Sequence, residues 1–370
     1  MKIVISGYVG RKITGIGRTL VNLLNASQSG NQYIVYTNFD MKDDMVFTNP
    51  NITVKTYNIS KLSSLKNLIW TTFVFPFIVI KENADRALIP NFTLLLFKFK
   101  PTLVIIHDLI EFNVPNKFSK KKMFYRTKLA NPITAKQANH IITISKNSQK
   151  DIENFLFVKK EKISVVNCGV DQNKFKRMSI ERAQSILKTR AWPYEFLLYV
   201  GTVDHPGKNA ITLIKAYTKL RYEGKIIDKL IIAGMPGKGF EFVDEYVKQS
   251  KYKNDIIFTG FISDEELIAL YSQCSVFCFI SLYEGFGIPP LEAMACGAKV
   301  VVSDTSSLPE VVGNLGSLVN PLDVDAVCNA ILFEKSREYN DIYYEKIQQH
   351  LKKYDWIEIS KQFETALQKG

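Results

Sequence analysis

Two glutamates on either side of a glycine and proline turn are the residues of this chain best suited to chemistry. They lie in the stretch from Ser281 to Gly297, S-L-Y-E-G-F-G-I-P-P-L-E-A-M-A-C-G, where Glu284 precedes the prolines and Glu292 follows them. A carboxylate accepts hydrogen bonds from two hydroxyl groups, so either glutamate could hold a ribose or a sugar ring. A glutamate in a first helical turn also has a simpler explanation, because the helix dipole favours it there by about 0.3–1 kcal/mol.

The sequence around these glutamates predicts a strand, a turn and a helix. The apolar run 275–280 is typical of a buried parallel strand, and residues 291–296 are helix formers that end at Gly297. The glycines allow a sharp turn and the two prolines fit the first helical positions, which places Glu292 in the first helical turn. The N–H groups at such a helix start attract phosphate.

The whole stretch resembles the E-x7-E signature of retaining GT-B glycosyltransferases of glycosyltransferase family 4, matched here by Glu284 and Glu292. The resemblance extends over essentially the whole chain and is strongest from Tyr199 to Gly313. It implies an α/β protein of the GT-B fold, with two doubly wound, Rossmann-like domains that face each other across a cleft. The donor would bind mainly in the second domain and the acceptor mainly in the first.

The resemblance also assigns expected roles to individual residues. Glu284 would hold the donor sugar hydroxyls, Glu292 the nucleotide ribose, and Lys208 the departing diphosphate, which a lysine neutralises as a point charge. Family members often carry an arginine in the loop 201–209, where this chain has none, so Arg18 is the candidate to complete the phosphate clamp. The full donor-binding set comprises Gly15, Gly17, Arg18, Thr202, Lys208, Gly285, Phe286, Gly287 and Glu292.

A histidine and an aspartate follow another strand. The run 103–109 reads L-V-I-I-H-D-L, which places His107 and Asp108 at the carboxyl end of a buried strand, where open α/β sheets bind ligands. A histidine that only caps the strand would look the same in sequence. The family resemblance implies the catalytic role, in which His107 helps to hold the donor sugar near the reaction centre.

The segment from Lys117 to Lys128 predicts a basic amphipathic helix. It carries six basic residues interleaved with aromatic ones, and a solvated charged face is the ordinary explanation for such a pattern. Residues 1–175 hold 25 Lys and Arg against 11 Asp and Glu, a net charge of +14, whereas the remainder has 23 against 25, a net of −2. This asymmetry favours contact with an anionic membrane surface. The predicted membrane or acceptor residues are Lys120, Lys121, Lys122, Phe124 and Arg126.

Composition limits the remaining possibilities. The chain has 370 residues, of which 46% are apolar and 23% charged, enough for two globular domains. Five cysteines without accompanying histidines indicate buried, reduced thiols and no zinc site, and we expect neither a metal nor another cofactor. The apolar run 68–80 is too short to span a bilayer and contains Pro76. With no signal peptide and no nucleic-acid motif, we expect a cytoplasmic enzyme on the inner face of the cell membrane.

Strands and helices alternate in both halves of the chain, and the resemblance implies where the domains divide. We expect an acceptor-binding domain at 1–175, a nucleotide-sugar-binding domain at 176–352, and a final helix at 353–370 that crosses back to the first domain. The loop 14–18 would lead into a helix over 18–25, but its glycines do not match a dinucleotide fingerprint. Strands are expected at residues 2–6, 33–37, 52–57, 86–89, 103–106, 140–145, 196–200, 230–233, 255–259, 275–280 and 299–303.

The resemblance implies a retaining hexosyltransferase of surface polysaccharide synthesis. The donor would be GDP-mannose, a UDP-hexose or dTDP-rhamnose, and the acceptor a glycan or a lipid-diphosphate-linked glycan. Two other functions share the architecture: a sugar-nucleotide 2-epimerase, which needs no acceptor, and a non-catalytic protein that binds nucleotide or a partner enzyme. A transferase would release nucleoside diphosphate only when acceptor is present, and this result would distinguish it from the other two functions.

Overall fold

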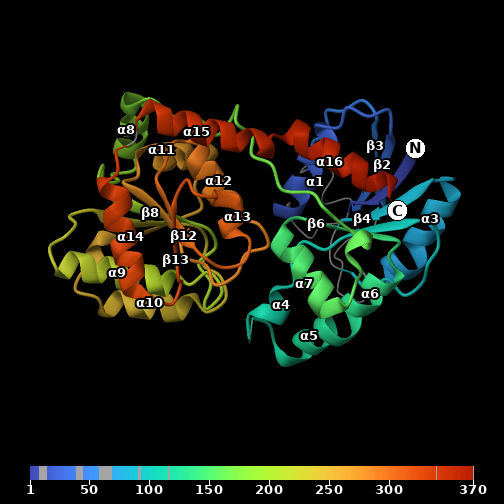
Figure 1. The fold of residues 1–370 in the computed structure, drawn as a ribbon, viewed down its shortest axis with the longest axis horizontal. Coiled ribbons are helices and arrows are strands. Elements are labelled where there is room, and N and C mark those ends of the chain that lie inside the picture. The colour runs from blue at the N-terminus through green and yellow to red at the C-terminus, as the bar shows by residue number, and fades with distance from the viewer. Residues whose placement is uncertain are drawn as a thin grey trace. The chain divides into compact units, whose positions relative to one another are not determined.

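The protein forms two compact units in a computed structural model, which describes residues 1–7, 15–38, 45–57, 69–90, 93–115, 117–338 and 340–369. Unit 1 comprises Met1–Gly169 together with Tyr354–Gly370, and unit 2 comprises Val170–Lys353. The chain therefore changes unit between Gly169 and Val170, somewhat before Phe175, and returns at Tyr354. Each unit is a parallel sheet with helices on both faces (Figure 1).

Unit 1 contains a seven-stranded parallel sheet in the order β3-β2-β1-β4-β5-β6-β7. Its strands are short and apolar because helices cover both faces of the sheet, and β5 and β6 are buried along their whole length. The strands are β1 (Lys2–Ser6), β2 (Gln32–Asn38), β3 (Ile52–Tyr57), β4 (Arg86–Ile89), β5 (Thr102–Ile105), β6 (His140–Thr143) and β7 (Ile163–Val165).

The helices of unit 1 form two layers with separate apolar cores. One core joins the sheet to α1 and α16, and the other joins it to the segment of η2 and α3, to α6 and to α7. The helices are α1 (Gly15–Asn25), η2 (Trp70–Val74), α3 (Phe75–Lys81), α4 (Ile110–Asn113), α5 (Lys120–Phe124), η3 (Tyr125–Ala130), α6 (Asn131–Gln137), α7 (Lys146–Leu156) and η4 (Lys160–Lys162).

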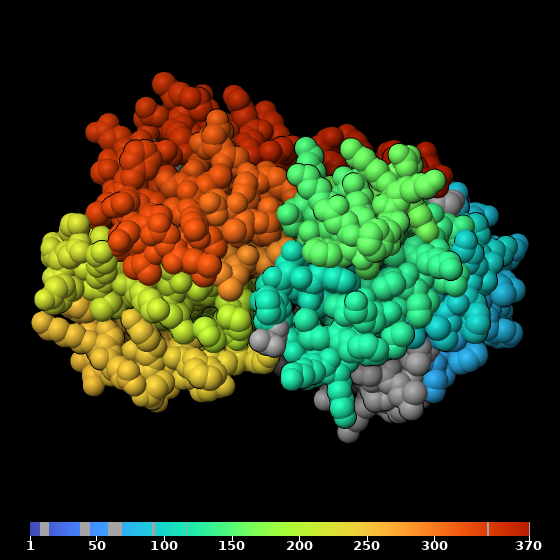
Figure 2. Space-filling model, turned by 60° about the horizontal axis from the view of Figure 1, so that its bottom comes forward, coloured from blue at the N-terminus to red at the C-terminus, as the bar shows by residue number. Residues whose placement is uncertain are grey.

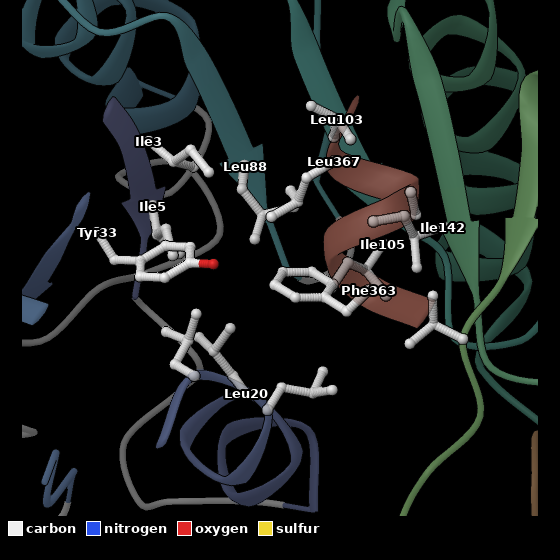
Figure 3. Close-up of a cluster of buried hydrophobic side chains, with 14 of the residues drawn as sticks. Ile3, Ile5, Leu20, Tyr33, Leu88, Leu103, Ile105, Ile142, Phe363 and Leu367 are labelled. Atoms are coloured by element: carbon white, nitrogen blue, oxygen red, sulfur yellow. The ribbon is translucent and has the colours of Figure 1, made fainter. Parts of the chain in front are cut away.

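The last helix, α16 (Trp356–Gln368), packs on the first unit. Asp355 caps it by accepting from Ile357 N at 2.8 Å, and its apolar side enters the core with α1. Figure 3 shows Phe363 and Leu367 of this helix among side chains from the strands and from α1, including Leu20, Leu88, Leu103 and Ile105. Ser360 Oγ also donates to Leu23 O at 3.2 Å, which fixes the helix to α1.

Unit 2 contains a six-stranded parallel sheet in the order β10-β9-β8-β11-β12-β13. The chain builds outward from β8 in one direction and then from β11 in the other, so the strand order reverses between β8 and β11. The strands are β8 (Phe196–Val200), β9 (Lys229–Ala233), β10 (Ile256–Gly260), β11 (Val276–Phe279), β12 (Val300–Ser303) and β13 (Ser317–Val319).

The helices of unit 2 cover both faces of this sheet (Figure 1). A capping box formed by Ser263 and Glu266, an S-x-x-E pattern in the sequence, begins α11, where each side chain bonds the other residue's backbone N–H. The helices are α8 (Ile180–Thr189), α9 (Ala210–Tyr222), α10 (Phe240–Gln249), η5 (Lys253–Asp255), α11 (Asp264–Gln273), α12 (Ile288–Ala295), α13 (Leu308–Val312), α14 (Val324–Ser336), α15 (Asp341–Leu351) and η6 (Lys352–Tyr354).

Each predicted strand occurs, with small shifts at its ends, but three predicted helices differ: α1, the basic segment and α12, the last described with the candidate site. Helix α1 begins at Gly15, so Gly15 and Gly17 lie in its first turn, whereas the sequence predicted them in a loop. The rest of that loop, including Thr14, lies outside the described residues. The basic segment is divided between α5 and the π-helix η3, and residues 117–119 precede the helix.

Candidate functional site

A lysine and a glutamate meet where the strand order of unit 2 reverses. Lys208 follows β8 and Glu284 follows β11, and these two strands are neighbours in the sheet. Lys208 Nζ donates to Glu284 Oε1 at 2.7 Å and to Oε2 at 2.8 Å. Their loops are joined by a backbone hydrogen bond from Leu282 N to Gly207 O at 2.9 Å. Ligands of doubly wound sheets bind at this point, so the pair occupies the expected ligand position.

The surroundings of Lys208 fix its loop and its ammonium group. Lys208 N donates to Asp204 Oδ1 at 2.9 Å, and the ammonium lies 5.4 Å from the centre of the Phe279 ring. Tyr199 donates its hydroxyl to Thr202 O at 3.2 Å. Burial, with the Glu284 and Asp204 charges adding to it, raises the pKa of Tyr199 well above its ordinary value, so the phenol stays protonated as a donor.

The turn from Glu284 to Gly287 is held by two serines of the segment before α13. Glu284 N donates to Ser306 Oγ at 3.0 Å, and Ser307 Oγ donates to Glu284 O at 2.9 Å and to Phe286 O. Gly287 has φ +117°, and a Cβ there would lie 2.7 Å from Leu308 Cδ2. Only glycine fits this position. Helix α12 begins at the next residue, Ile288.

The prediction that Glu292 lies in the first helical turn is wrong. Helix α12 starts at Ile288, directly after Gly287, and its first turn holds both prolines and no acidic residue. Glu292 therefore lies one turn further along, half-buried, where Tyr271 donates its hydroxyl to Glu292 Oε2 at 3.2 Å. Burial, followed by the Glu292 charge, raises the pKa of Tyr271 well above its usual range, so this phenol also remains a donor.

The other predicted donor residues of unit 2 differ in exposure. Thr202 is exposed in the loop after β8, whereas Gly285 is buried and Phe286 is only 3% exposed. The Phe286 ring therefore packs inside the unit, and what this residue offers to a ligand is its backbone.

His107 lies at a small pocket in unit 1, beyond the carboxyl ends of the strands. The pocket has a volume of about 90 Å³ and includes Ile16, Thr93, Asp108, Arg126 and Asn131 in its lining. His107 Nε2 lies 2.9 Å from Pro90 O, and because a carbonyl oxygen can only accept, Nε2 carries the hydrogen. Removal from water lowers the pKa of His107, so the ring is neutral at pH 7 and Nδ1 is an acceptor.

Arg126, predicted as a membrane or acceptor residue, has a largely buried side chain that is turned inward. Arg126 Nε donates to Glu111 Oε1 at 2.9 Å, and the arginine side chain is 17% exposed while the glutamate carboxylate is fully buried. Asn131 Nδ2 donates to the same oxygen at 2.6 Å. A buried carboxylate requires a cationic partner, and this requirement turns the guanidinium toward the pocket of His107 and away from the outer surface.

The remaining predicted residues lie in two places. Arg18 is exposed in the first turn of α1, near buried Gly17. Four of the predicted residues are exposed on α5, as expected for a basic helix at the surface: Lys120, Lys121, Lys122 and Phe124, the last to 61%. Lys122 Nζ lies 4.2 Å from the centre of the Phe118 ring, so this lysine stacks on an aromatic residue of its own segment.

Several residues of these sites were not identified from the sequence: Glu111, Asn131, Tyr271 and Ser307. For Glu111 the sequence offers one local signal. It stands four residues after His107, between an isoleucine and a phenylalanine, and a carboxylate in such apolar surroundings requires a partner. Tyr271 and Ser307 gave none, because their partners are distant in sequence. Among the residues that the structure describes, no cluster of His, Cys, Asp or Glu could hold a metal ion.

Comparisons with known proteins identify the family of the chain. The family model described as "Glycosyltransferase Family 4" matches residues 13–174, and that described as "Glycosyl transferases group 1" matches residues 186–350. Each unit thus corresponds to one of the two models. The chain belongs to the group 1, family 4 glycosyltransferases of the GT-B fold.

Two curated relatives carry more specific names. The chain is 32% identical over 243 residues to O-antigen chain mannosyltransferase B of Escherichia coli, a match that covers 66% of this chain and 63% of the relative. It is 27% identical over 288 residues to O-antigen chain mannosyltransferase RfbU of Salmonella typhimurium, covering 77% and 75%. The chain spans less than two thirds of the length of the first relative.

A solved structure supports the fold of both units. Anabaena Alr3699/HepE in complex with UDP-glucose matches with a TM-score of 0.77 at 18% identity, over 100% of this chain and 99% of the other. At this identity the likeness shows the shared fold.

Proposed function

We propose that the protein is a retaining hexosyltransferase that moves mannose from GDP-mannose to a glycan or lipid-linked glycan in surface polysaccharide synthesis. The choice of mannose and of the acceptor class is supported by the names of the two relatives, both O-antigen chain mannosyltransferases. UDP-hexoses and dTDP-rhamnose are the alternative donors. HepE, with its bound UDP-glucose, shows that the fold accepts a nucleotide-sugar.

The observation that carries the proposal is the Lys208–Glu284 pair beside the start of α12. An ammonium has three donors, so Lys208 can hold Glu284 and a phosphate oxygen at once. The helix N-terminus adds N–H donors and a positive dipole end on the other side of the turn. These groups would stabilise the negative charge that develops on the leaving diphosphate, the task that a bound metal performs in other enzymes.

The two glutamates would divide the donor between them. Glu284, at the turn, would accept hydrogen bonds from sugar hydroxyls, and Glu292, one helical turn inward, from the ribose hydroxyls. Tyr271 then acts as a positioning residue, because its hydroxyl fixes one carboxylate oxygen of Glu292. The bond between the anomeric carbon and the diphosphate oxygen would break, and the acceptor hydroxyl oxygen would bond to that carbon on the same face, which gives retention. The acceptor proton would pass to the departing diphosphate.

The pocket of unit 1 would receive a polar part of the substrates. Neutral His107, with Nε2–H bound to Pro90 O, offers Nδ1 as an acceptor for a sugar hydroxyl. Arg126, held through Nε by Glu111, presents a cationic group at the same pocket, which fits an acceptor that carries a phosphate. We also assign the protein to the inner face of the cell membrane, with the exposed lysines of α5 against anionic lipid.

The test begins with a thermal-shift panel of GDP-, UDP-, dTDP- and ADP-sugars. A ligand at a hundredfold excess over its Kd stabilises the native state by about 2.7 kcal/mol. We expect GDP-mannose to raise the melting temperature of the wild type and of Glu338→Ala, an exposed glutamate of unit 2 that serves as the matched control, but not of Glu292→Ala. A shift that survives in Glu292→Ala would remove the ribose role.

The reaction is then followed with a lipid-linked glycan acceptor. We expect GDP release only with acceptor, and ¹H NMR of the product should show the α-configuration of the donor. Conversion of the nucleotide-sugar without acceptor would identify a 2-epimerase instead. No shift with any nucleotide-sugar and no turnover would leave a non-catalytic protein.

A further inference from the structure

The helical segment formed by η2 and α3, residues 69–81, has two apolar faces. Its inner face enters the second core of unit 1 with Trp70, Phe75, Ile78 and Val79, which are at most 6% exposed. Its outer face is equally apolar: Ile69 is 45% exposed, Phe73 65%, Phe77 66% and Ile80 59%. A surface helix ordinarily places polar residues on that side.

The outward residues form a single stripe. They follow one another at intervals of four, four and three positions, and residues three or four apart lie on the same side of a helix. The first charged residue of the segment is Lys81, at its end. Two phenylalanines and an isoleucine, each more than half exposed and adjacent along one helix, indicate a contact surface.

The neighbouring segments of the same layer are basic. Thr93 Oγ1 donates to Thr71 Oγ1 at 2.9 Å and Thr134 Oγ1 donates to Thr93 O at 2.9 Å, so η2, residues 93–100 and α6 are bonded in sequence. On the surface in Figure 2, the area coloured light blue to cyan adjoins the teal area of residues 117–130. Residues 69–81, 93–100 and 117–138 contain ten Lys or Arg and no Asp or Glu.

We infer that this layer docks on an anionic lipid bilayer, with the Phe73–Phe77–Ile80 stripe inserted in the interfacial region and the lysines at the phosphate level. The excess of basic residues in these three segments is complementary to anionic headgroups, and large apolar side chains beside lysines are the composition of interfacial helices. Within the described residues no helix is long and apolar enough to cross a membrane, so the segment would lie along the surface. The inference adds to the proposed location on the membrane an apolar contact that the basic helix alone does not supply.

Vesicle co-sedimentation tests the inference on the full chain. The probes are vesicles of phosphatidylcholine alone and of phosphatidylcholine with 30% phosphatidylglycerol. Phe73→Ser/Phe77→Ser should bind the anionic vesicles at least tenfold more weakly than the wild type, because each ring removed takes a large apolar area out of the contact. The matched control is Phe261→Ser/Phe333→Ser, which removes two phenylalanines of unit 2 that are 78% and 55% exposed, and should bind like the wild type.

Two further variants distinguish the electrostatic contribution of the lysines from the insertion of the apolar stripe. Lys120→Ser/Lys121→Ser/Lys122→Ser should lose affinity for anionic vesicles, about fivefold for each lysine at low salt, and leave the weak binding to neutral vesicles unchanged. In Phe77→Trp, brominated lipid should quench the added tryptophan, whereas in Phe261→Trp it should quench nothing beyond the wild-type background.

The outcomes distinguish this inference from the proposed activity. Nucleotide-sugar binding in solution should be the same in the stripe variants and the wild type, with equal melting temperatures as the check on folding. Equal vesicle binding by Phe73→Ser/Phe77→Ser and the wild type, or no quenching of the added tryptophan in Phe77→Trp, would overturn the inference and leave the transferase proposal intact. Binding that depends on the lysines alone would reduce the contact to electrostatics and also overturn it.

Discussion

Glu284→Gln and Lys208→Met should change nucleoside diphosphate affinity in opposite directions, although both should reduce turnover. The reason is the geometry of the pair, in which Glu284 receives two hydrogen bonds from Lys208, at 2.7 and 2.8 Å, next to the expected diphosphate position. Glu284→Gln removes a negative charge that repels the diphosphate and keeps the side-chain shape. Lys208→Met removes the cation that would bind a phosphate oxygen.

The size of each effect follows from these distances. A phosphate oxygen bonded to Lys208 at about 2.8 Å would lie roughly 4.5 Å from the Glu284 carboxylate, since ammonium donors are tetrahedral. Two like charges at about 4.5 Å repel by roughly 1 kcal/mol in water and nearly 4 kcal/mol at an effective dielectric constant of about 20. The side chains are 26% and 13% exposed, so solvent screening reduces the effect toward the lower value. We expect Glu284→Gln to bind GDP about 5- to 30-fold more tightly, which corresponds to about 1–2 kcal/mol.

For Lys208→Met the expected loss is larger. A hydrogen bond to a charged group contributes about 1.5–3 kcal/mol, so GDP should bind roughly 10- to 150-fold more weakly. Turnover should fall by about 10²–10³ in both variants, because each loses a group that acts on the reacting bond.

Isothermal titration calorimetry with GDP measures both affinities, with Lys251→Met, an exposed lysine of unit 2, as the control expected to match the wild type. The opposite signs are the essential result. Equal weakening by Glu284→Gln and Lys208→Met would show that the pair is a structural unit that must stay intact, and the reasoning would be refuted.

Three further predictions concern parts of the structure that support the sites. Tyr271→Phe should raise the donor KM several-fold with little change in kcat, because the hydroxyl orients Glu292 through a 3.2 Å bond; a fall in kcat alone in steady-state kinetics would contradict the positioning role. Gly287→Ala should destabilise unit 2 by about 1–3 kcal/mol, because φ is +117° there and the new Cβ would lie 2.7 Å from Leu308 Cδ2. Gly15→Ala should instead be stabilising by about 0.5–1 kcal/mol, because its backbone is helical and there is open space for the Cβ. Thermal denaturation of the two glycine variants should shift in opposite directions. Burial, with help from the Lys369 and Lys162 charges, lowers the pKa of His140 to about 4, so the unfolded chain binds a proton that the folded chain does not between pH 6.5 and 4. The wild type should lose roughly 2–3 kcal/mol of stability as pH falls through that window, and His140→Gln should lose less; identical pH profiles in urea denaturation would rule out this residue as a source of the loss.

Most of the strands and their order in the chain could be predicted because they depend on local pattern, whereas the three-residue strand β13 was not predicted. Short Val- and Ile-rich runs such as 103–106 and 299–303 are buried on both faces of a parallel sheet, which gives them a signal that needs no knowledge of their neighbours. The position of Glu284 after β11 followed in the same way, from the strand before it and the glycines after it. The capping box at Ser263 was equally local.

Helix starts were predicted less well because they depend on backbone geometry. The first turn of α12 was displaced from its predicted place by the turn at Gly287, which has φ +117° and follows a residue whose carbonyl is held by the Ser307 hydroxyl. The start of α1 at Gly15 and the division of the basic segment into α5 and η3 are of the same kind. In each case propensity is a weak preference that tertiary contacts override.

The sequence by itself determined the two parallel α/β sheets, the family and the positions along the chain of Glu284, Glu292, His107 and Lys208. Only the tertiary structure decided which of these side chains meet. Lys208 and Glu284 are 76 residues apart and form an ion pair because β8 and β11 are neighbours where the strand order reverses. Arg126, predicted as a membrane or acceptor residue from the charge of its segment, turns inward because a buried carboxylate at Glu111 requires a cation. Charge and periodicity are local properties of a sequence, whereas the partner of a charge depends on which strands and helices the fold brings together.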